Sequence, residues 1–151
     1  MTEAKAIDVW KHQSPQGGSQ GAKQEIPLFT APISAGPPSS ADNAIDQKVD
    51  LNEFLIKNPT ATFFVRVEGT SMLDAGIHPG DILIVDKSLE AEPDTVVVAI
   101  VDGEFLVKRY ITECGKPCLV ADNPDFGRIE LTDDMHVEIW GVVTFVIHKA
   151  T

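Results

Sequence analysis

The stretch Thr95-Val-Val-Val-Ala-Ile-Val-Asp-Gly-Glu-Phe-Leu-Val-Lys-Arg-Tyr110 decides the fold class of this 151-residue chain. Its two halves, residues 95–101 and 104–110, are rich in β-branched and aromatic residues and have the length of strands. Between them, Asp102-Gly103 is the dipeptide that a two-residue type I′ turn prefers, because both central residues need a positive φ. The stretch therefore predicts an antiparallel hairpin.

Apolar segments and turns alternate on both sides of this hairpin. Residues 63–68 and 81–86 precede it, and residues 118–121 and 136–149 follow it. Gly141 interrupts the last of these segments and is expected to mark a bulge or bend. Short strands at close spacing are typical of barrels and sandwiches. We predict an all-β fold built mainly from antiparallel strands.

The N-terminal third has a different composition. Residues 1–35 are expected to form a flexible arm, because their first part is rich in Gln, Gly and Ser. Residues 36–50 are expected to be a linker, and residues 51–151 the β-rich domain. That domain should begin with a short helix at residues 51–57, for which Asp50 supplies the N-cap.

Charge narrows the range of functions. The formal net charge is −11 at pH 7, and the sequence pI is about 4.6. Such a chain repels phosphate backbones, so we expect no direct DNA binding, whether sequence-specific or not. No stretch reaches the ~18–20 consecutive apolar residues of a membrane helix, and the N-terminus lacks the pattern of a secretory signal. We therefore expect a cytoplasmic protein without a membrane partner.

The two cysteines, Cys114 and Cys118, are expected to be free thiols in a reducing compartment. The residues between them, Gly115-Lys116-Pro117, read as a turn. A zinc site needs four ligands, and no Cys/His cluster in the sequence completes one. We therefore predict no metal and no cofactor.

Ser71 is the first candidate for chemistry, in the turn Gly69-Thr70-Ser71-Met72 directly after an apolar strand. A hydroxyl is a poor nucleophile until a base removes its proton. Backbone N–H groups of the turn could stabilise an oxyanion, and Gly69 allows an unusual backbone there. The alternative is a solvated serine, since turns favour this residue.

Lys108 is the second candidate, because it lies inside an apolar strand. Strand alternation places it on the same face as Leu106 and Tyr110. A buried lysine that loses its charge can act as a general base. The alternative is a lysine whose stem is packed while its amine reaches water. Neither Ser71 nor Lys108 alone identifies a catalytic site. The stretches of sequence around both residues, taken together, distinguish a catalytic pair from these alternatives.

That context resembles the LexA/UmuD family of self-cleaving serine peptidases. The likeness is carried by Val67-Glu-Gly-Thr-Ser-Met72, Gly76-Ile-His-Pro-Gly-Asp-Ile-Leu-Ile-Val85 and Asp102-Gly-Glu-Phe-Leu-Val-Lys-Arg109. Ile139-Trp-Gly-Val-Val143 adds to it, and the likeness extends from about Ile26 to Thr151. It implies a β-core like that of LexA and signal peptidase.

The resemblance also implies a role for each site residue. Ser71 corresponds to the nucleophile and Lys108 to its general base, while Gly69 and Met72 belong to the oxyanion turn. Ala35-Gly36 corresponds to the small-residue–glycine bond at which such proteins cut their own chain. The proline-flanked apolar segment around that bond can add to a sheet edge as a strand and present the bond to the serine. Tethering would raise its effective concentration.

Within this family the UmuD-like branch is the closer match, because the N-terminal arm has no helix-turn-helix pattern for reading an operator. The resemblance implies a homodimer in the SOS response to DNA damage, stimulated by the RecA–single-strand DNA filament. The trimmed chain, residues 36–151, would be the accessory subunit of a Y-family translesion polymerase of the UmuC kind.

Three other readings stay open. His78 could serve as the base in a Ser-His-Asp triad, although Asp81, Asp86 and Asp102 read better as strand-end and turn residues. The chain could be a non-catalytic dimeric binding module of the same fold. It could also be a signal peptidase, which shares a Ser-Met motif and a lysine base, although the missing membrane anchor argues against this.

Overall fold

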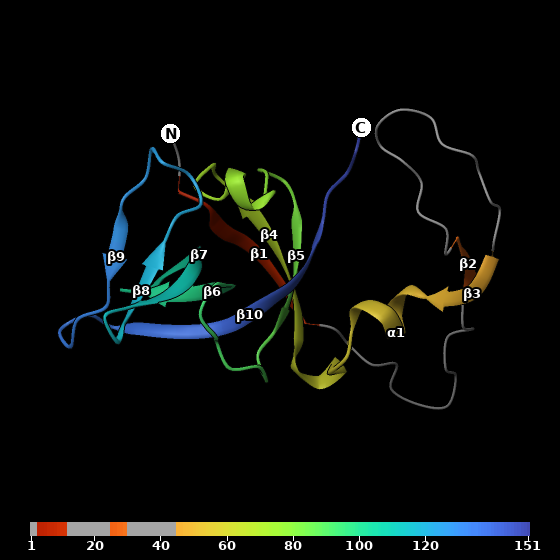
Figure 1. The fold of residues 1–151 in the computed structure, drawn as a ribbon, viewed down its shortest axis with the longest axis horizontal. Coiled ribbons are helices and arrows are strands. Elements are labelled where there is room, and N and C mark those ends of the chain that lie inside the picture. Colours follow the sequence, from red (N-terminus) through yellow and green to blue (C-terminus); the bar gives the residue numbers. More distant parts are fainter. Residues whose placement is uncertain (1–2, 12–24, 30–44) are drawn as a thin grey trace. The chain divides into compact units, whose positions relative to one another are not determined.

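A computed structural model describes residues 3–11, 25–29 and 45–151 of the chain (Figure 1). These residues fall into two compact units. Residues 3–11 and 58–151 belong to the larger unit, and residues 25–29 and 45–57 belong to the smaller one. Among the described residues, no helix combines the length and the apolar character needed to cross a bilayer.

The larger unit is a single antiparallel sheet of eight strands in the order β1-β4-β5-β10-β6-β7-β8-β9. Its strands are β1 (Lys5–Lys11), β4 (Thr62–Glu68), β5 (Ile82–Asp86), β6 (Thr95–Val101), β7 (Glu104–Glu113), β8 (Lys116–Val120), β9 (Arg128–Glu130) and β10 (Val137–Ile147). The edge strand β1 also pairs with β7, through Lys5 and Leu106, so the sheet curls back on itself. The predicted all-β, mainly antiparallel fold is therefore confirmed, with a barrel-like core.

The predicted hairpin is present as β6 and β7. Val101 pairs with Glu104 across the two-residue turn. Asp102 and Gly103 have φ values of 48° and 84°, as the turn type requires. A second two-residue turn, at Cys114-Gly115, joins β7 to β8. Lys116 and Pro117, which read as part of a turn in the sequence, instead begin β8.

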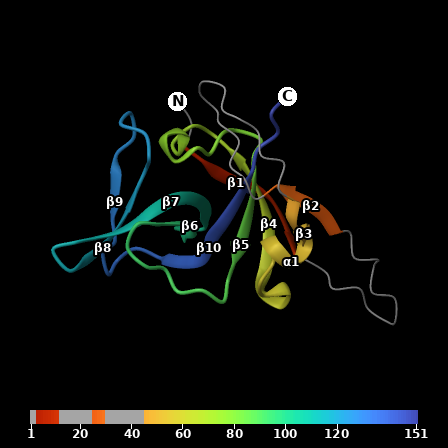
Figure 2. The same ribbon diagram turned by 45° about the vertical axis from the view of Figure 1, so that its right-hand side comes forward.

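The longest strand, β10, links the two halves of the sheet (Figure 2). Its first part pairs with β6 and its second part with β5. The register shifts between Ile139 and Gly141, which confirms the bulge expected there. A Cβ at Gly141 would lie 2.6 Å from Cγ1 of Val85, so the close approach of β10 to β5 requires glycine.

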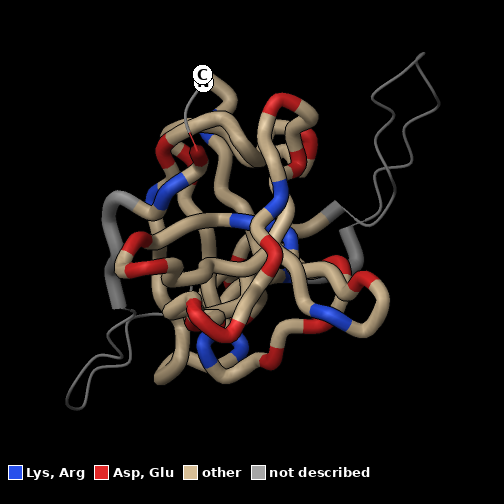
Figure 3. Tube along the Cα trace, turned by 90° about the vertical axis from the view of Figure 1, so that its left-hand side faces the viewer, with Lys and Arg blue, Asp and Glu red and all other residues tan. Residues whose placement is uncertain are grey.

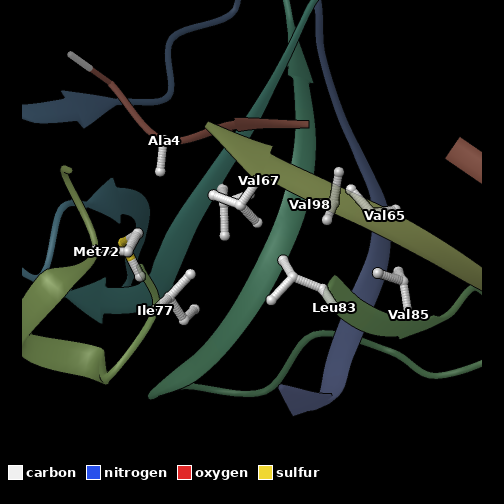
Figure 4. Close-up of a cluster of buried hydrophobic side chains, with 9 residues drawn as sticks. Ala4, Val65, Val67, Met72, Ile77, Leu83, Val85 and Val98 are labelled. Carbon is white, nitrogen blue, oxygen red and sulfur yellow. The ribbon is translucent and has the colours of Figure 1, made fainter. Parts of the chain in front are cut away.

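The core of the larger unit contains a cluster of buried apolar side chains from β4, β5, β6 and β7 and from the segments beside them (Figure 4). The cluster comprises Ala4, Val65, Val67, Met72, Ile77, Leu83, Val85, Val98 and Val107. Ala4 is the notable member, because it brings the start of the chain into the same core as the turn that carries Ser71.

The smaller unit consists of strands β2 (Glu25–Phe29) and β3 (Ile45–Asp50), which pair antiparallel, and helix α1 (Leu51–Leu55). Asp50 caps α1 as predicted, because its carboxylate accepts hydrogen bonds from the backbone N–H groups of Asn52 and Glu53. The helix is two residues shorter than expected, since Ile56 is already extended. The next element along the chain, the 3-10 turn η1 (Pro59–Ala61), already belongs to the larger unit.

Three strands lie where the sequence predicted a flexible arm and a linker: β1 and β2 in the arm, and β3 in the linker. Residues 5–11 include Ile7, Val9 and Trp10, which favour strands, so a local signal was present. What makes β1 a strand is its pairing with β4, which lies about 60 residues away in the sequence and leaves no local pattern. The expected boundary at Ala35-Gly36 lies outside the described residues.

Candidate functional site

Ser71 is fully buried directly beyond the end of β4. Gly69 has a φ of 96°, so the turn after β4 uses the left-handed region that glycine adopts without strain. The hydroxyl oxygen of Ser71 accepts a hydrogen bond of 2.8 Å from the backbone N–H of Ala4. The alternative of a solvated turn serine is therefore wrong.

The turn is anchored from two sides. Met72 is fully buried in the core, and its sulfur accepts a hydrogen bond of 3.4 Å from the backbone N–H of Asp122. The side-chain amide of Asn123 donates to the carbonyl of Thr70 at 2.9 Å. The turn geometry around Ser71 is thus fixed by the loop that follows β8.

Arg109 in turn holds that loop. Its Nε lies 2.9 and 2.8 Å from the two carboxylate oxygens of Asp122. The hydrogen bonds to Asp122 raise the pKa of the Arg109 guanidinium further, although burial opposes them. Sequence reasoning missed Asp122 and Asn123 because they lie about 50 residues from the turn; the Arg109 next to Lys108 was the only local hint.

Lys108 is the largest fully buried side chain of the described residues. It lies in β7 opposite Val97 of β6. Its ammonium group forms an ion pair with the carboxylate of Glu3, whose side chain is partly exposed. The ring of Phe126 lies beside it, with its centroid 5.9 Å from Nζ. The alternative in which the amine reaches water is therefore wrong.

Ser71 and Lys108 meet the same dipeptide of the chain. Ser71 contacts the backbone of Ala4, and Lys108 contacts the side chain of Glu3. The two candidate residues, 37 positions apart in the sequence, are thus brought to one place by the curling of the sheet. Each is desolvated there, which is the setting that the chemistry of a serine and a lysine base needs.

The N-terminal segment lies between the strand that leads to Ser71 and the strand that carries Lys108. Lys5 pairs with Glu68 of β4 on one side and with Leu106 of β7 on the other. The carbonyl of Ala4 accepts a hydrogen bond of 3.0 Å from the N–H of Val107. An extended peptide with a small, buried side chain therefore fills a groove whose walls supply backbone hydrogen bonds.

Lys108 cannot act as a base while its ammonium is paired with a carboxylate. In the described arrangement the site holds an extended segment, a buried hydroxyl and a charged lysine. This arrangement binds peptide backbone but leaves the hydroxyl without a proton acceptor at Lys108.

The carboxylates considered as alternatives have structural positions. Asp86 ends β5 and accepts hydrogen bonds from the Asn58 side chain at 2.6 Å and from Ser88. Burial alone would raise its pKa, but these hydrogen bonds outweigh it, so the pKa of Asp86 is lowered. Asp102 forms the hairpin turn, and Asp81 immediately precedes β5.

His78 lies with Asp81 and His148. The hydroxyl of Ser71 is bonded instead to the Ala4 backbone. The geometry thus gives no support to a triad built on His78. The expected cleavage bond, Ala35-Gly36, lies outside the described residues, as does His12.

Comparison with known proteins identifies the family to which the chain is similar. The profile of the family described as "Peptidase S24-like" matches residues 27–144. Protein MucA of Salmonella typhimurium is 45% identical over 129 residues, which cover 83% of this chain and 88% of that protein. Protein ImpA of Escherichia coli is 42% identical over 125 residues, covering 82% and 83%. LexA repressor 1 of Pseudomonas syringae pv. tomato is 37% identical over 118 residues, covering 78% and 58%.

Proposed function

Because this chain belongs to the Peptidase S24-like family of LexA/UmuD-like peptidases, we propose that it is a serine peptidase that cuts its own chain. Ser71 is the nucleophile, Lys108 the general base, and Ala35-Gly36 the bond that is cleaved. The observation that carries the proposal is the groove between β4 and β7. It binds an extended segment and brings the buried Ser71 and Lys108 to one dipeptide of that segment.

The reaction has two steps. Neutral Lys108 takes the proton of the Ser71 hydroxyl while the oxygen attacks the carbonyl carbon of Ala35. The tetrahedral intermediate collapses, the nitrogen of Gly36 receives the proton and leaves, and Ala35 remains as an ester on Ser71. Water then hydrolyses this ester, with Lys108 again accepting and returning a proton. Backbone N–H groups of the turn that Gly69 and Met72 define stabilise the oxyanion.

The position of the N-terminal segment supports binding of the substrate as an extended strand. The backbone of residues 4–6 pairs with β4 and β7, and the Ala4 side chain is buried to 1% exposure. Ala35 is equally small, and Gly36 allows the backbone to approach closely. The cleavage segment therefore competes with residues 3–6 for one groove.

We place the activity in the SOS response. The relatives include a LexA repressor and the proteins MucA and ImpA, and the UmuD-like members support an accessory role in SOS mutagenesis. The stimulus is the RecA–single-strand DNA filament, the product is residues 36–151 as a homodimer, and its partner is a UmuC-like Y-family polymerase. With these proposed partners, the proposed location is the cytoplasm.

The test is the intact mass of the purified chain after incubation with RecA, ATP and single-stranded DNA, and in parallel at raised pH. A fragment that begins at Gly36, absent from the Ser71→Ala chain, is the expected result. Alkaline conditions should accelerate cleavage, because Lys108 must lose a proton. Continued cleavage in the Ser71→Ala chain would overturn the proposed nucleophile.

The second candidate is a non-catalytic dimeric binding module. The ion pair between Lys108 and Glu3 favours it, because a lysine held in that pair is not a base. An unchanged mass under both conditions, with folded protein, would support this function and overturn self-cleavage.

A further inference from the structure

Three potential metal ligands meet at the end of the sheet, in the loop before β5 and just after β10. Nδ1 of His148 lies 2.6 Å from one carboxylate oxygen of Asp81, and Nδ1 of His78 lies 3.8 Å from the other. The two imidazole rings are 4.9 Å apart between centroids. One ligand atom from each of the three residues falls within 4.8 Å of the others.

Strand register brings His148 to Asp81. The last pair between β10 and β5 joins Ile147 to Ile82. The residue that follows β10 therefore lies beside the residue that precedes β5, although 67 positions separate them. The sequence contains no local spacing that reveals this pair, which is why no metal site was predicted.

A tight turn brings His78 to the same carboxylate. The N–H of Asp81 donates to the carbonyl of His78 at 3.1 Å, and the N–H of His78 donates to the Asp81 carboxylate at 2.8 Å. Gly80 within this turn has a φ of 89°, and its N–H donates to the carbonyl of Val67. The backbone thus holds His78 and Asp81 in place before an ion binds. Binding therefore loses less conformational entropy than it would at a flexible site.

We propose that His78, Asp81 and His148 bind one divalent transition-metal ion of the zinc class. The ligand set is two imidazole nitrogens and one carboxylate oxygen, which suits Zn²⁺, Co²⁺ or Ni²⁺ and not the all-oxygen preference of Mg²⁺ or Ca²⁺. The Asp81 side chain is only 3% exposed, whereas the two imidazoles are 48% and 53% exposed. The carboxylate therefore forms the buried floor of the site, and the side between the two imidazoles is open to an ion and its remaining water ligands.

The spacing fits after small movements. Ligand atoms around a tetrahedral ion with bonds near 2.0–2.2 Å are about 3.3–3.6 Å apart. The distances from Asp81 to His148 and to His78, 2.6 and 3.8 Å, bracket this value. The half-exposed rings are free of tight packing on their outer side and can rotate into place. The ion would lie between Nδ1 of His148 and the Asp81 carboxylate, which the present contact already brings together.

Binding would tie the end of β10 to the loop before β5. It involves neither Ser71 nor Lys108, so it is independent of the proposed peptidase activity. The net charge of −11 also raises the local concentration of cations around the chain. Figure 3 shows where the acidic and basic residues lie along the described part of the chain.

The test is Zn²⁺ binding to the full chain by calorimetry, in a Cys114→Ser background that removes the exposed thiol. The expected result is one ion per chain. His78→Ala and His148→Ala should each weaken binding by more than the roughly 10–100-fold that loss of a supporting residue costs. His136→Ala, which removes a histidine outside the cluster, is the matched control and should bind as the parent does.

Two further readouts keep the result clear. Co²⁺ should give visible absorption in the parent and lose it in His148→Ala, and Zn²⁺ should slow hydrogen exchange at residues 147–149 in the parent alone. Thermal unfolding checks that each variant is folded. Equal Zn²⁺ affinity in the parent and both variants, or no Zn²⁺ binding by the folded parent, would overturn the proposal.

Discussion

The backbone N–H of Ala4 donates a hydrogen bond of 2.8 Å to the hydroxyl oxygen of Ser71. The preceding residue, Glu3, pairs with Lys108. The chain thus places its own start across both residues that the proposed reaction needs. The proposed self-cleavage then depends on a competition for one groove, between residues 3–6 and the segment that contains Ala35-Gly36.

Removing the charge of Glu3 should shift that competition. Glu3→Gln keeps the size of the side chain but no longer pairs with the ammonium of Lys108. Because Glu3 is partly exposed, we expect a modest gain, about two- to fivefold in the rate of self-cleavage. The rate is measured as the appearance of the fragment beginning at Gly36 with RecA, ATP and single-stranded DNA.

Glu113→Gln is the matched control. It removes the same charge from the exposed pair between Glu113 and Arg128, which involves neither Lys108 nor residues 3–6. Its cleavage rate should equal that of the unmodified chain. If Glu3→Gln and Glu113→Gln behave alike, the pair between Glu3 and Lys108 does not restrain the reaction.

Much of the β-core could be predicted because its signals are local. The hairpin at Asp102-Gly103 follows from one dipeptide between two apolar runs, and Gly141 marks its bulge by sequence alone. Helix α1 begins where the Asp50 cap predicts. These features need no knowledge of distant partners.

The surroundings of the site could not be predicted in the same way. The contacts of Ser71 with Ala4, and of the turn with Asp122 and Asn123, join segments about 50 or more residues apart. Strand alternation indicates which face Lys108 occupies but not what lies opposite. Ser71 and Lys108 are identified as site residues through a family resemblance. Their neighbours Glu3 and Ala4 are known only from the structure, in which β1 pairs with both β4 and β7.

Gly141 should not tolerate a methyl group. In Gly141→Ala the new Cβ would lie 2.6 Å from Cγ1 of the fully buried Val85 and 3.3 Å from the carbonyl oxygen of Asp86. Overpacking of this kind costs about 1–3 kcal/mol of unfolding free energy. Urea denaturation measures it. Gly127→Ala is the control, since a Cβ there meets nothing within 4 Å, and an equal loss in both variants would rule out the steric cause.

Asp86 should make stability depend on pH. Burial raises the pKa of Asp86, but hydrogen bonds from Asn58 and Ser88 lower it more, so its folded pKa is below the ordinary value of 3.8. Because this pKa is lowered, the ionised Asp86 carboxylate contributes to the free energy of unfolding above the unfolded-state pKa. That contribution is lost as the pH falls through the folded-state pKa. Asp86→Asn should therefore be less stable than the parent at neutral pH, with the difference shrinking below about pH 4. Urea midpoints across this range measure it, and a constant difference would contradict the assignment.

The two cysteines should differ in reactivity. Cys114 is exposed in the turn between β7 and β8, whereas Cys118 is buried with its sulfur 3.3 Å from the carbonyl oxygen of Ile129. Burial raises the pKa of the Cys118 thiol, so less thiolate forms at mild alkaline pH. Iodoacetamide at pH about 8 should label Cys114 quickly and Cys118 only after unfolding. Peptide mass mapping measures this, with Cys114→Ser as the control that should take up no label while folded.

Rapid labelling of folded Cys114→Ser would contradict the prediction, because it would show that β8 opens readily. The pairing of Cys118 with both β7 and β9 argues against such opening.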